Sequence, residues 1–414
     1  MANAKMTFLS PSEIDLVHHQ SLRALKEIGI RVHSAPVLKL LEAKGAEVDF
    51  NSCVAKLSER VIGDALCSAP KTFKLCARNS QHDLTMPAHP YPYATTSGLA
   101  VFVTDHETGK YRPSTRRDIA AFARLGDALS PDFLWTAITA NDVPKMAHGP
   151  HELWETLKNS QKHVQGVTVQ SARDAQVQIE LAALVAGGHE ALRERPLMSV
   201  VSCPLAPLSF ETGAIEAQTT FARAGIPICS MSMSLGGLSA PVTVAGMILN
   251  ANAENLASIV ITQAAASGAP HIYTSESAPM DMLTGNINYG APEKALVSYG
   301  LGQMARYYDL PCLVADTGFG DSIKGGLEDV QFIANQFIGL TAYTDIITGM
   351  GCVDDAKGIS FEQLVIDSYM WDFFRAFLKE VEISEEMMGL EAIKAVGHGG
   401  DFLSSEHTLK YLLE

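Results

Sequence analysis

Eight short apolar runs, spaced through the middle of the chain, constrain its fold more than any other feature. They begin at intervals of roughly 30–44 residues, and stretches with helical periodicity separate most of them. Such a run is typical of a strand buried on both faces. Parallel strands need crossover connections of about this length, usually helices. The eight runs are Tyr93–Leu99, Asp132–Ile138, His163–Thr168, Leu197–Cys203, Pro227–Met233, His271–Ser277, Cys312–Thr317 and Ile346–Cys352.

Eight strand–helix units predict an α/β fold, a (β/α)8 TIM barrel, over residues 91–360. An open doubly wound sheet is the alternative arrangement. Helix start signals at Ser10 and Ser34 predict an α+β segment over residues 1–90, which we expect to pack on the barrel. Residues 361–414 predict a helical extension that is too long for a simple barrel closure. We expect it to cover the barrel or to form a contact between copies of a homo-oligomer.

Charge and cysteine usage limit the classes of partner. The chain has 31 Lys and Arg against 46 Asp and Glu, a net charge of −15, whereas binding to nucleic acid or an anionic membrane needs a basic surface. Its seven cysteines form no CxxC pair, which is typical of reduced thiols in a cytoplasmic protein. No long apolar stretch follows Met1 and no 18-residue apolar run is uninterrupted, so we expect neither a signal peptide nor a membrane-spanning helix.

Barrel enzymes carry their chemistry on the residues that follow each strand. The stretch Leu310–Asp321 has this form, because an apolar core is followed by Asp316 and then by a glycine-rich loop. A carboxylate that ends a buried strand needs a partner. We therefore predict catalytic roles for Asp316 and for Glu276, which closes the preceding strand.

Aromatic and hydroxyl side chains stand at other expected strand ends, and His398 lies between glycines in the C-terminal extension. Acidic residues crowd the loops after the last two strands, which favours a cation over a phosphate as ligand. Quaternary ammonium groups bind in aromatic cages. Core positions remain an alternative for Trp135 and Tyr273, and a structural cap for His398. The predicted substrate-binding residues are Tyr93, Thr96, Trp135, Tyr273, Phe319 and His398.

Several common catalytic motifs are missing from the sequence. No lysine lies within a predicted strand near its end, which disfavours a Schiff-base aldolase. The nucleophile elbow G-x-S-x-G is absent, and so are HExxH and C-x2-C patterns, so we predict no metal site and no tightly bound cofactor.

Four sequence segments resemble the trimethylamine methyltransferase superfamily, and the resemblance runs over nearly the whole chain. Founding members of that family use pyrrolysine, whose position would fall around Gly318–Asp321, where this chain has standard residues. The chain is therefore similar to the larger branch that lacks pyrrolysine. The segments are LKEIGIRVHS…LLEAKGAEVDF…APKTFKLCARN near the start, TTSG at the first strand, MSMSLGGLSAPVTVAG (Met231–Gly246), and GGDFLSSEHTLKYL at the end.

The resemblance implies an activity and a partner. Known members of this branch demethylate quaternary amines such as glycine betaine, proline betaine and carnitine, and the methyl acceptor is a cobamide carried by a separate corrinoid protein. We expect glycine betaine as the first substrate. The alternatives are another quaternary amine, a non-catalytic quaternary-ammonium binding protein and, less favoured, a barrel lyase that binds phosphate in its glycine-rich loops.

Overall fold

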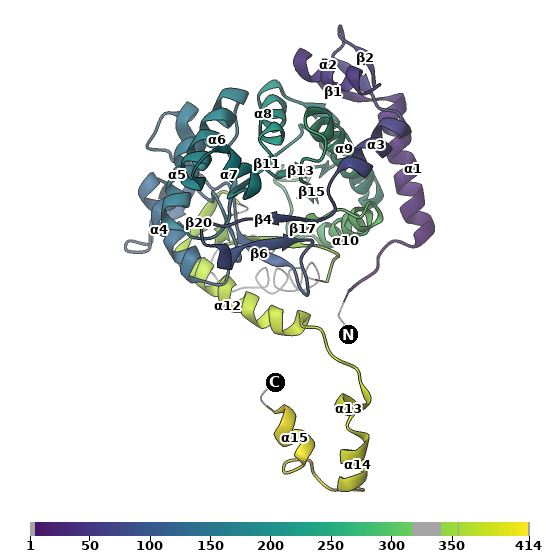
Figure 1. The fold of residues 1–414 in the computed structure, drawn as a ribbon, viewed down its shortest axis with the longest axis vertical. Coiled ribbons are helices and arrows are strands. Elements are labelled where there is room, and N and C mark those ends of the chain that lie inside the picture. The colour runs from purple at the N-terminus through teal and green to yellow at the C-terminus, as the bar shows by residue number, and fades with distance from the viewer. Residues whose placement is uncertain (1–4, 317–340, 355, 413–414) are drawn as a thin grey trace.

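A computed structural model describes residues 5–316, 341–354 and 356–412 and shows a barrel of strands inside a ring of helices (Figure 1). The parallel sheet has the order β6-β18-β17-β15-β13-β11-β10-β9, and a bridge between Thr95 and Phe133 joins its two edges. The predicted TIM barrel is thus confirmed, and the alternative open sheet was wrong. Its strands are β6 (Tyr93–Thr96), β9 (Leu134–Trp135), β10 (Val164–Gly166), β11 (Met198–Ser202), β13 (Ile228–Ser232), β15 (His271–Ser275), β17 (Cys312–Asp316) and β18 (Ile346–Met350).

Helices on the outside connect successive strands. The longest, α9, has the length and hydropathy of a membrane span, but 72% of its apolar window is buried inside the protein, so it packs as a core helix. The helices of the ring are α4 (Arg116–Ala128), α5 (His148–Asn159), α6 (Ala172–Ala186), α7 (His189–Glu194), α8 (Thr212–Arg223), α9 (Val244–Ala265), α10 (Pro292–Tyr307) and α12 (Phe361–Leu378).

Side chains of each strand alternate between the barrel interior and the helix layer, as the pleat requires. On β15, Ile272 joins the interior cluster with Met231 of β13. Its neighbour Tyr273 has the opposite direction and packs with residues of α9 and α10. This alternation decides which strand-end residues can reach the mouth of the barrel.

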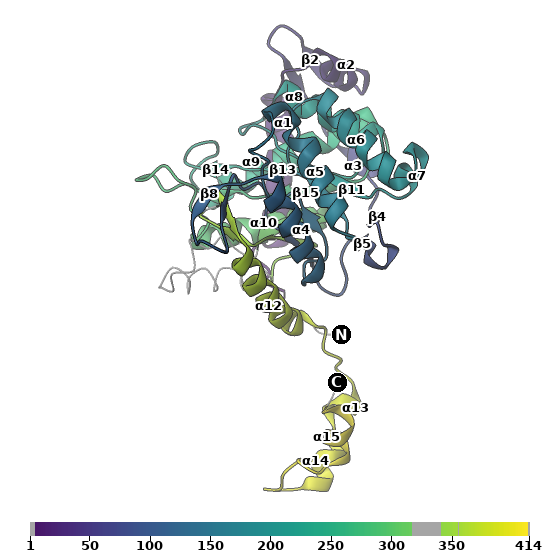
Figure 2. The same ribbon diagram turned by 90° about the vertical axis from the view of Figure 1, so that its left-hand side faces the viewer.

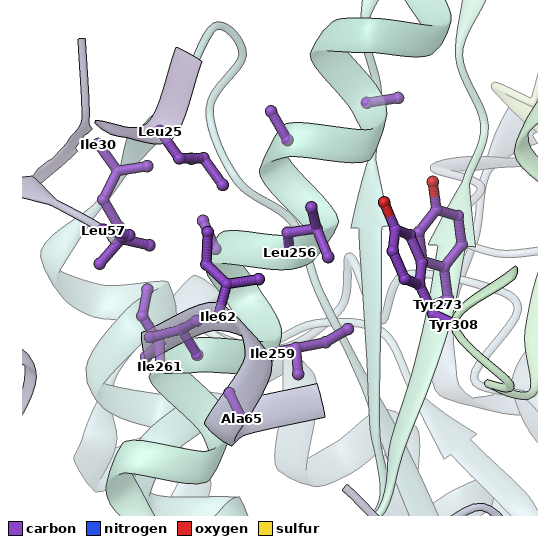
Figure 3. Packing of buried hydrophobic residues seen from close by; sticks show 14 of the residues in the cluster. Leu25, Ile30, Leu57, Ile62, Ala65, Leu256, Ile259, Ile261, Tyr273 and Tyr308 are labelled. Carbon is purple, nitrogen blue, oxygen red and sulfur yellow. The ribbon is translucent and has the colours of Figure 1, made fainter. Parts of the chain in front are cut away.

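The N-terminal segment covers part of the helix ring. Side chains of Ser10, Ser34 and Ser58 accept backbone N–H groups at the starts of its three helices, and the sequence predicts the first two of these starts. Figure 3 shows Leu25 and Ile62 of this segment packed against α9. The segment contains α1 (Pro11–Glu27), α2 (Ala35–Ala43), α3 (Glu59–Ser68) and the strands β1 (Ile30–Val32), β2 (Glu47–Asp49) and β3 (Val54–Lys56), which form a sheet with β12 (Ser209–Phe210).

A hairpin closes the amino-terminal end of the barrel. It consists of β4 (Phe73–Leu75) and β5 (Leu84–Met86), joined through the short 3-10 helix η1 (Ser80–His82). Leu75 and Met86 belong to the interior cluster of the barrel. The opposite, carboxyl-terminal end is therefore the end at which a ligand can enter.

Additional strands follow the barrel strands at the carboxyl-terminal end. A four-stranded sheet has the order β19-β20-β7-β8, and a short parallel pair joins the segments after β13 and β15. A second 3-10 helix, η2 (Lys145–Ala147), precedes α5. The strands are β7 (Phe102–Thr104), β8 (Tyr111–Pro113), β19 (Cys352–Val353), β20 (Gly358–Ser360), β14 (Leu235–Gly236) and β16 (Ala278–Pro279).

The chain ends in an arm that extends away from the barrel beyond α12 (Figure 2). The arm, residues 384–412, contains α13 (Glu385–Met388), α14 (Leu390–Val396) and α15 (Glu406–Tyr411), and none of these helices has a buried residue. The helical character of the C-terminal extension is confirmed. The domain boundaries at residues 90 and 360 stay predictions.

Candidate active site

Two carboxylates and one ammonium meet at the carboxyl-terminal end of neighbouring strands. Nζ of Lys294 lies 2.6 Å from Oδ2 of Asp316 and 3.3 Å from Oε2 of Glu276. The side chains of Lys294 and Glu276 are 7% and 5% exposed. These three residues, which we call the mouth triad, carry a net charge of −1 when both carboxylates are ionised.

Three different elements deliver the mouth triad. Asp316 is the last residue of β17, and Glu276 follows β15, where its backbone N–H donates to the carbonyl of Ser232. Glu276 continues the inward alternation of Ile272, which turns its carboxylate toward the mouth. Lys294 lies in the first turn of α10, a helix that begins at Pro292. The long segment between β15 and α10 thus brings the Lys294 side chain back to the ends of β15 and β17.

Burial and charge shape the protonation of the mouth triad. Burial raises the pKa of Glu276 to about 7; the ammonium of Lys294 opposes this shift and the Asp316 carboxylate adds to it. Burial alone would lower the pKa of Lys294, but the two carboxylates outweigh it and raise that pKa. Lys294 is therefore a cation at neutral pH, and the raised pKa of Glu276 lets this carboxyl change charge near pH 7.

One oxygen of the mouth triad is left open. Among the described residues, Oε1 of Glu276 has no hydrogen-bond partner, although it is buried. A buried carboxylate oxygen without a partner is costly. A cationic ligand above the strand ends would meet this cost by placing positive charge beside the oxygen.

A second buried carboxylate anchors the strand next to β15. Glu254 of α9 accepts from the hydroxyl of Ser232 at 2.5 Å and from the backbone N–H of Leu208 at 2.9 Å. Asn250 donates to the same carboxylate at 3.0 Å. These donors use both oxygens of Glu254, so Glu254 has a positioning role. It fixes the end of β13, where the carbonyl of Ser232 accepts the backbone N–H of Glu276.

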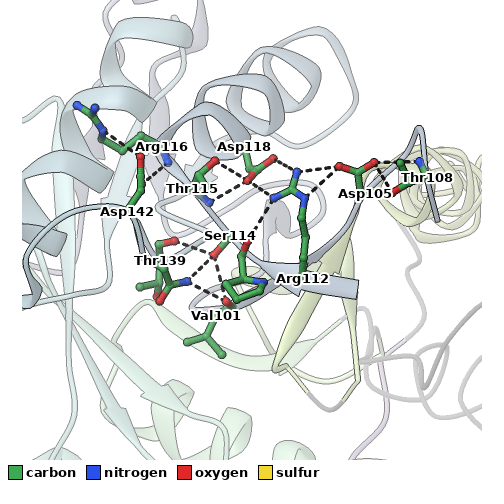
Figure 4. Close-up of polar contacts among 12 residues, drawn as sticks. Val101, Asp105, Thr108, Arg112, Ser114, Thr115, Arg116, Asp118, Thr139 and Asp142 are labelled. Atoms are coloured by element: carbon green, nitrogen blue, oxygen red, sulfur yellow. Dashed lines mark hydrogen bonds and ion pairs between the residues drawn. The ribbon is translucent and has the colours of Figure 1, made fainter. Parts of the chain in front are cut away.

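An ion-pair network stiffens the opposite side of the mouth (Figure 4). Arg112 of β8 donates to both oxygens of Asp118 in α4, at 2.8 and 2.9 Å, and to Asp105 at 3.0 Å. Bidentate pairs of this kind fix geometry as well as charge. The hydroxyl of Ser114 donates to the carbonyl of Thr139 at 2.7 Å and so joins the loops that follow β6 and β9.

Among the predicted wall residues, Trp135 is one that the structure places in the barrel interior. It ends β9, belongs to the interior cluster with Val167, and packs closely beneath the backbone of Gly98. Its indole Nε1 has no hydrogen-bond partner among the described residues. A substrate-binding role for Trp135 stays a proposal.

Tyr93 and Tyr273 do not lie at the mouth, so their predicted positions were wrong. Tyr93 is the first residue of β6, and its hydroxyl donates to the carbonyl of Thr85 in the hairpin that closes the amino-terminal end. Tyr273 points into the helix layer, where its hydroxyl donates to Oδ1 of Asn252 at 2.9 Å and its ring lies 6.5 Å from that of Tyr308. Strand alternation is the reason: Tyr273 and Glu276 face opposite sides of the sheet.

Thr96 and His398 also lie away from the mouth triad. Thr96 faces the helix layer beside Gly126 of α4, and its hydroxyl oxygen accepts the backbone N–H of Trp135 at 3.0 Å. His398 is exposed in the arm, between α14 and α15, and does not reach the barrel of its own chain. Phe319, the remaining predicted wall, lies outside the described residues, as does the glycine-rich loop Gly318–Gly326.

Lys294 is the residue that the sequence prediction missed. The prediction concerned lysines within strands, and Lys294 belongs to a helix. The sequence marks a helix start at Ala291-Pro292-Glu293-Lys294, but it does not show which strand ends this first turn contacts. The described residues contain no group of three His, Cys, Asp or Glu side chains arranged for a metal ion.

Comparison with known proteins identifies the family. A family model for trimethylamine methyltransferase (MTTB) matches residues 2–412. Trimethylamine methyltransferase MttB of Desulfitobacterium hafniense (strain DSM 10664 / DCB-2) is 31% identical over 404 residues, which are 97% of this chain and 81% of that protein. Glycine betaine methyltransferase of Desulfitobacterium hafniense (strain Y51) is 28% identical over 412 residues, or 98% of this chain and 84% of that protein.

A solved structure supports the fold independently of these sequence matches. The crystal structure of the Methanosarcina barkeri monomethylamine methyltransferase (MtmB) aligns with a TM-score of 0.58 and 13% identity, over 92% of this chain and 83% of that one. At this identity the likeness concerns the barrel fold alone. The sequence matches carry the assignment: this chain belongs to the trimethylamine methyltransferase family and is a methyltransferase.

Proposed function

We propose that this methyltransferase moves a methyl group from a quaternary amine to the Co(I) of a partner corrinoid protein. Glycine betaine, which would yield dimethylglycine, is the first substrate that we propose. The observation that carries the proposal is the buried Oε1 of Glu276, which has no hydrogen-bond partner among the described residues. It belongs to a triad whose net charge is −1 when both carboxylates are ionised. Support for the substrate class also comes from the similarity to a glycine betaine methyltransferase.

The chemistry needs little from the protein beyond binding and orientation. The Co(I) of the corrinoid supplies the nucleophile. The breaking N–C bond leaves its electron pair on nitrogen, so the leaving group is a neutral tertiary amine and no proton has to be donated. What remains for the chain is to hold the amine in line and to exclude water. The net negative charge of the mouth triad with both carboxylates ionised favours a methylated cation, and we assign none of these residues as a corrinoid ligand.

In this proposal, each residue of the mouth triad has its own task. Glu276 places negative charge beside the quaternary nitrogen, which cannot donate a hydrogen bond. Lys294 holds the Glu276 carboxylate through the 3.3 Å contact, and Asp316 fixes the Lys294 ammonium at 2.6 Å. Trp135 offers an aromatic surface from the interior. Lys294 pairs with both carboxylates, so the carboxylate of a betaine needs an anchor outside the mouth triad.

An anaerobic transfer assay tests the proposal. The purified protein is mixed with chemically reduced cobalamin and one amine at a time: glycine betaine, proline betaine, carnitine, choline or trimethylamine. Conversion of cob(I)alamin to methylcobalamin is followed by absorbance, and the demethylated amine by mass spectrometry. We expect transfer from at least one quaternary amine. Transfer from trimethylamine alone would contradict the proposed substrate class.

Equilibrium binding separates the proposal from its main rival. A non-catalytic binding protein would bind glycine betaine in calorimetry and yet methylate no cobalamin, with or without the corrinoid protein expressed from the same source. Transfer from proline betaine or carnitine in place of glycine betaine would keep the reaction class and correct the substrate.

A further inference from the structure

The C-terminal part of the chain exposes an unusual number of large apolar side chains. Single exposed apolar residues are normal on a protein surface, but a contiguous group marks an interaction site. Those of the arm are Met388, Leu390, Ile393, Phe402, Leu403, Leu409 and Leu412, and those of α12 are Val365, Ile366, Tyr369, Phe373 and Phe377.

The arm cannot be stabilised by its own contacts. Its helices have 4, 7 and 6 residues, well below the length at which an isolated helix is stable in water. The helices enclose a groove of about 1020 Å³, with Met388, Leu390 and Ile393 in its lining. Hydrogen bonds of the arm, such as those from Lys410 and Tyr411 to Glu386, run within the arm. Its helix caps and turns are thus well formed, but its apolar side chains have no core.

The exposed face of α12 is a second apolar surface. Val365, Tyr369 and Phe373 follow each other at four-residue spacing and therefore lie along one side of the helix. Tyr369 is 76% and Phe373 is 64% exposed. The other side of α12 packs on the barrel through Leu364 and Trp371. We call the exposed side, Val365, Ile366, Tyr369 and Phe373, the α12 stripe.

We propose that the arm of each copy packs on the α12 stripe of a second copy of this chain, so that two chains exchange arms about a two-fold axis. The arm extends away from α12 (Figure 2), and the four side chains of the α12 stripe are exposed. Two apolar surfaces of one chain that do not cover each other are complementary in a two-fold pair, since each copy offers both. The exchange provides two such contacts for each dimer, and a stable interface draws on about 20–30 residues from each partner.

Charge indicates that apolar contact, and not ion pairing, carries this interface. The arm has Glu385, Glu386, Glu391, Asp401 and Glu406 against two lysines, and the whole chain has a net charge of −15. Two such arms repel each other at low ionic strength, and salt screens this repulsion. The proposed dimer therefore tightens, or stays unchanged, when salt is added, whereas an acidic arm bound to a basic partner would be released.

Sedimentation velocity of the full-length protein tests the exchange. We expect a species of twice 44.5 kDa at micromolar concentration in both low and high salt. The double variant Tyr369→Glu/Phe373→Glu places charge on the α12 stripe and should weaken dimerisation at least tenfold. Leu184→Glu, at a 73% exposed position on α6, is the matched control and should leave the dimer intact. Near-UV and far-UV circular dichroism verifies that each variant is folded.

A mixing experiment distinguishes exchange from other dimers. The arm variant Leu403→Lys/Leu409→Lys should be monomeric by itself, like the stripe variant. When the two variants are mixed, the lysines of one arm meet the glutamates of the other chain's stripe, and the second contact keeps its native residues on both sides. We expect the mixture to recover the mass of two chains. A monomeric native protein, a stripe variant with native affinity, or a mixture that stays monomeric would each overturn the proposal.

Discussion

Nζ of Lys294 lies 2.6 Å from Oδ2 of Asp316, so the first turn of α10 is tied to the last residue of β17. The same ammonium reaches Glu276 beyond the end of β15, at 3.3 Å. A buried cation between two carboxylates is stable because each charge has a partner. If one partner is removed, the remaining charges stay buried without full compensation, which is costly in a low dielectric. The mouth of this barrel therefore depends on a residue supplied by the helix layer.

Replacement of Lys294 should destabilise the fold. In Lys294→Met two buried carboxylates lose their cation, so we expect the free energy of unfolding at pH 8 to fall by about 3–5 kcal/mol. Urea unfolding monitored by circular dichroism measures the change. The matched control is Lys357→Met, whose exposed pair with Asp354 spans 3.7 Å and should contribute less than about 0.5 kcal/mol. Equal effects of the two variants would show that the mouth triad is not a buried ion pair.

Glu276 should make stability depend on pH in a defined direction. Its pKa is raised from an ordinary value of 4.5 to about 7, so the folded state binds this proton more tightly than the unfolded chain does. The unfolding free energy should therefore fall as pH rises from 4.5 to 7, and Glu276→Gln should lose that part of the slope. Unfolding of both proteins at pH 5 and pH 8 measures it. Identical slopes would mean that Glu276 titrates as in water.

Variants at Tyr273 and Trp135 should affect different properties, the stability of the fold and the affinity for the amine substrate. Tyr273→Phe leaves Oδ1 of Asn252 without its donor, so we expect a loss of about 1–2 kcal/mol in stability and unchanged affinity for the amine substrate. Trp135→Leu, at the interior-facing end of β9, should weaken that affinity. Calorimetric titration and urea unfolding of both variants provide the comparison. Weaker amine binding by Tyr273→Phe would contradict the outward orientation of that side chain.

Asp345 offers a buried carboxylate at the other end of the barrel. Its oxygens accept the backbone N–H of Cys312 at 2.8 Å and pair with Arg306 at 2.6 Å. In Asp345→Asn the charge of this pair is lost, and we expect a stability loss of about 1–3 kcal/mol. Affinity for the amine should not change, because this residue lies before β18 and far from the mouth. A parallel loss of affinity would show that general destabilisation, and not the mouth triad, controls binding.

Much of the fold could be predicted from the sequence, because strands buried on both faces read as short apolar runs. The eight runs became the eight barrel strands, and the helix starts at Ser10 and Ser34 lie where the sequence places them. These signals are local, and their spacing along the chain was enough to indicate a barrel. The position of the arm relative to the barrel depends on contacts that no local pattern describes.

The candidate site could be predicted in part. Glu276 and Asp316 were found because a carboxylate at the end of a buried strand is unusual, and the structure brings both to one ammonium. Tyr273 was predicted in the site, although it lies three residues before Glu276. Side chains at that spacing on a strand face opposite sides of the sheet, so this rule would have excluded Tyr273. Lys294 was missed because contact between the start of a helix and the ends of two strands is a tertiary relationship that sequence spacing does not reveal.

In the proposed mechanism, the ionised carboxylate of Glu276 holds a quaternary amine for methyl transfer. The most direct measurement is kcat/KM for transfer from glycine betaine to cob(I)alamin, compared between the native protein, Glu276→Gln and Asp345→Asn at pH 8. We predict that Glu276→Gln lowers kcat/KM by about 100-fold, a size typical of the loss of one electrostatic contact at a reacting centre. Asp345→Asn should retain native activity. Native kcat/KM in Glu276→Gln would contradict the claim.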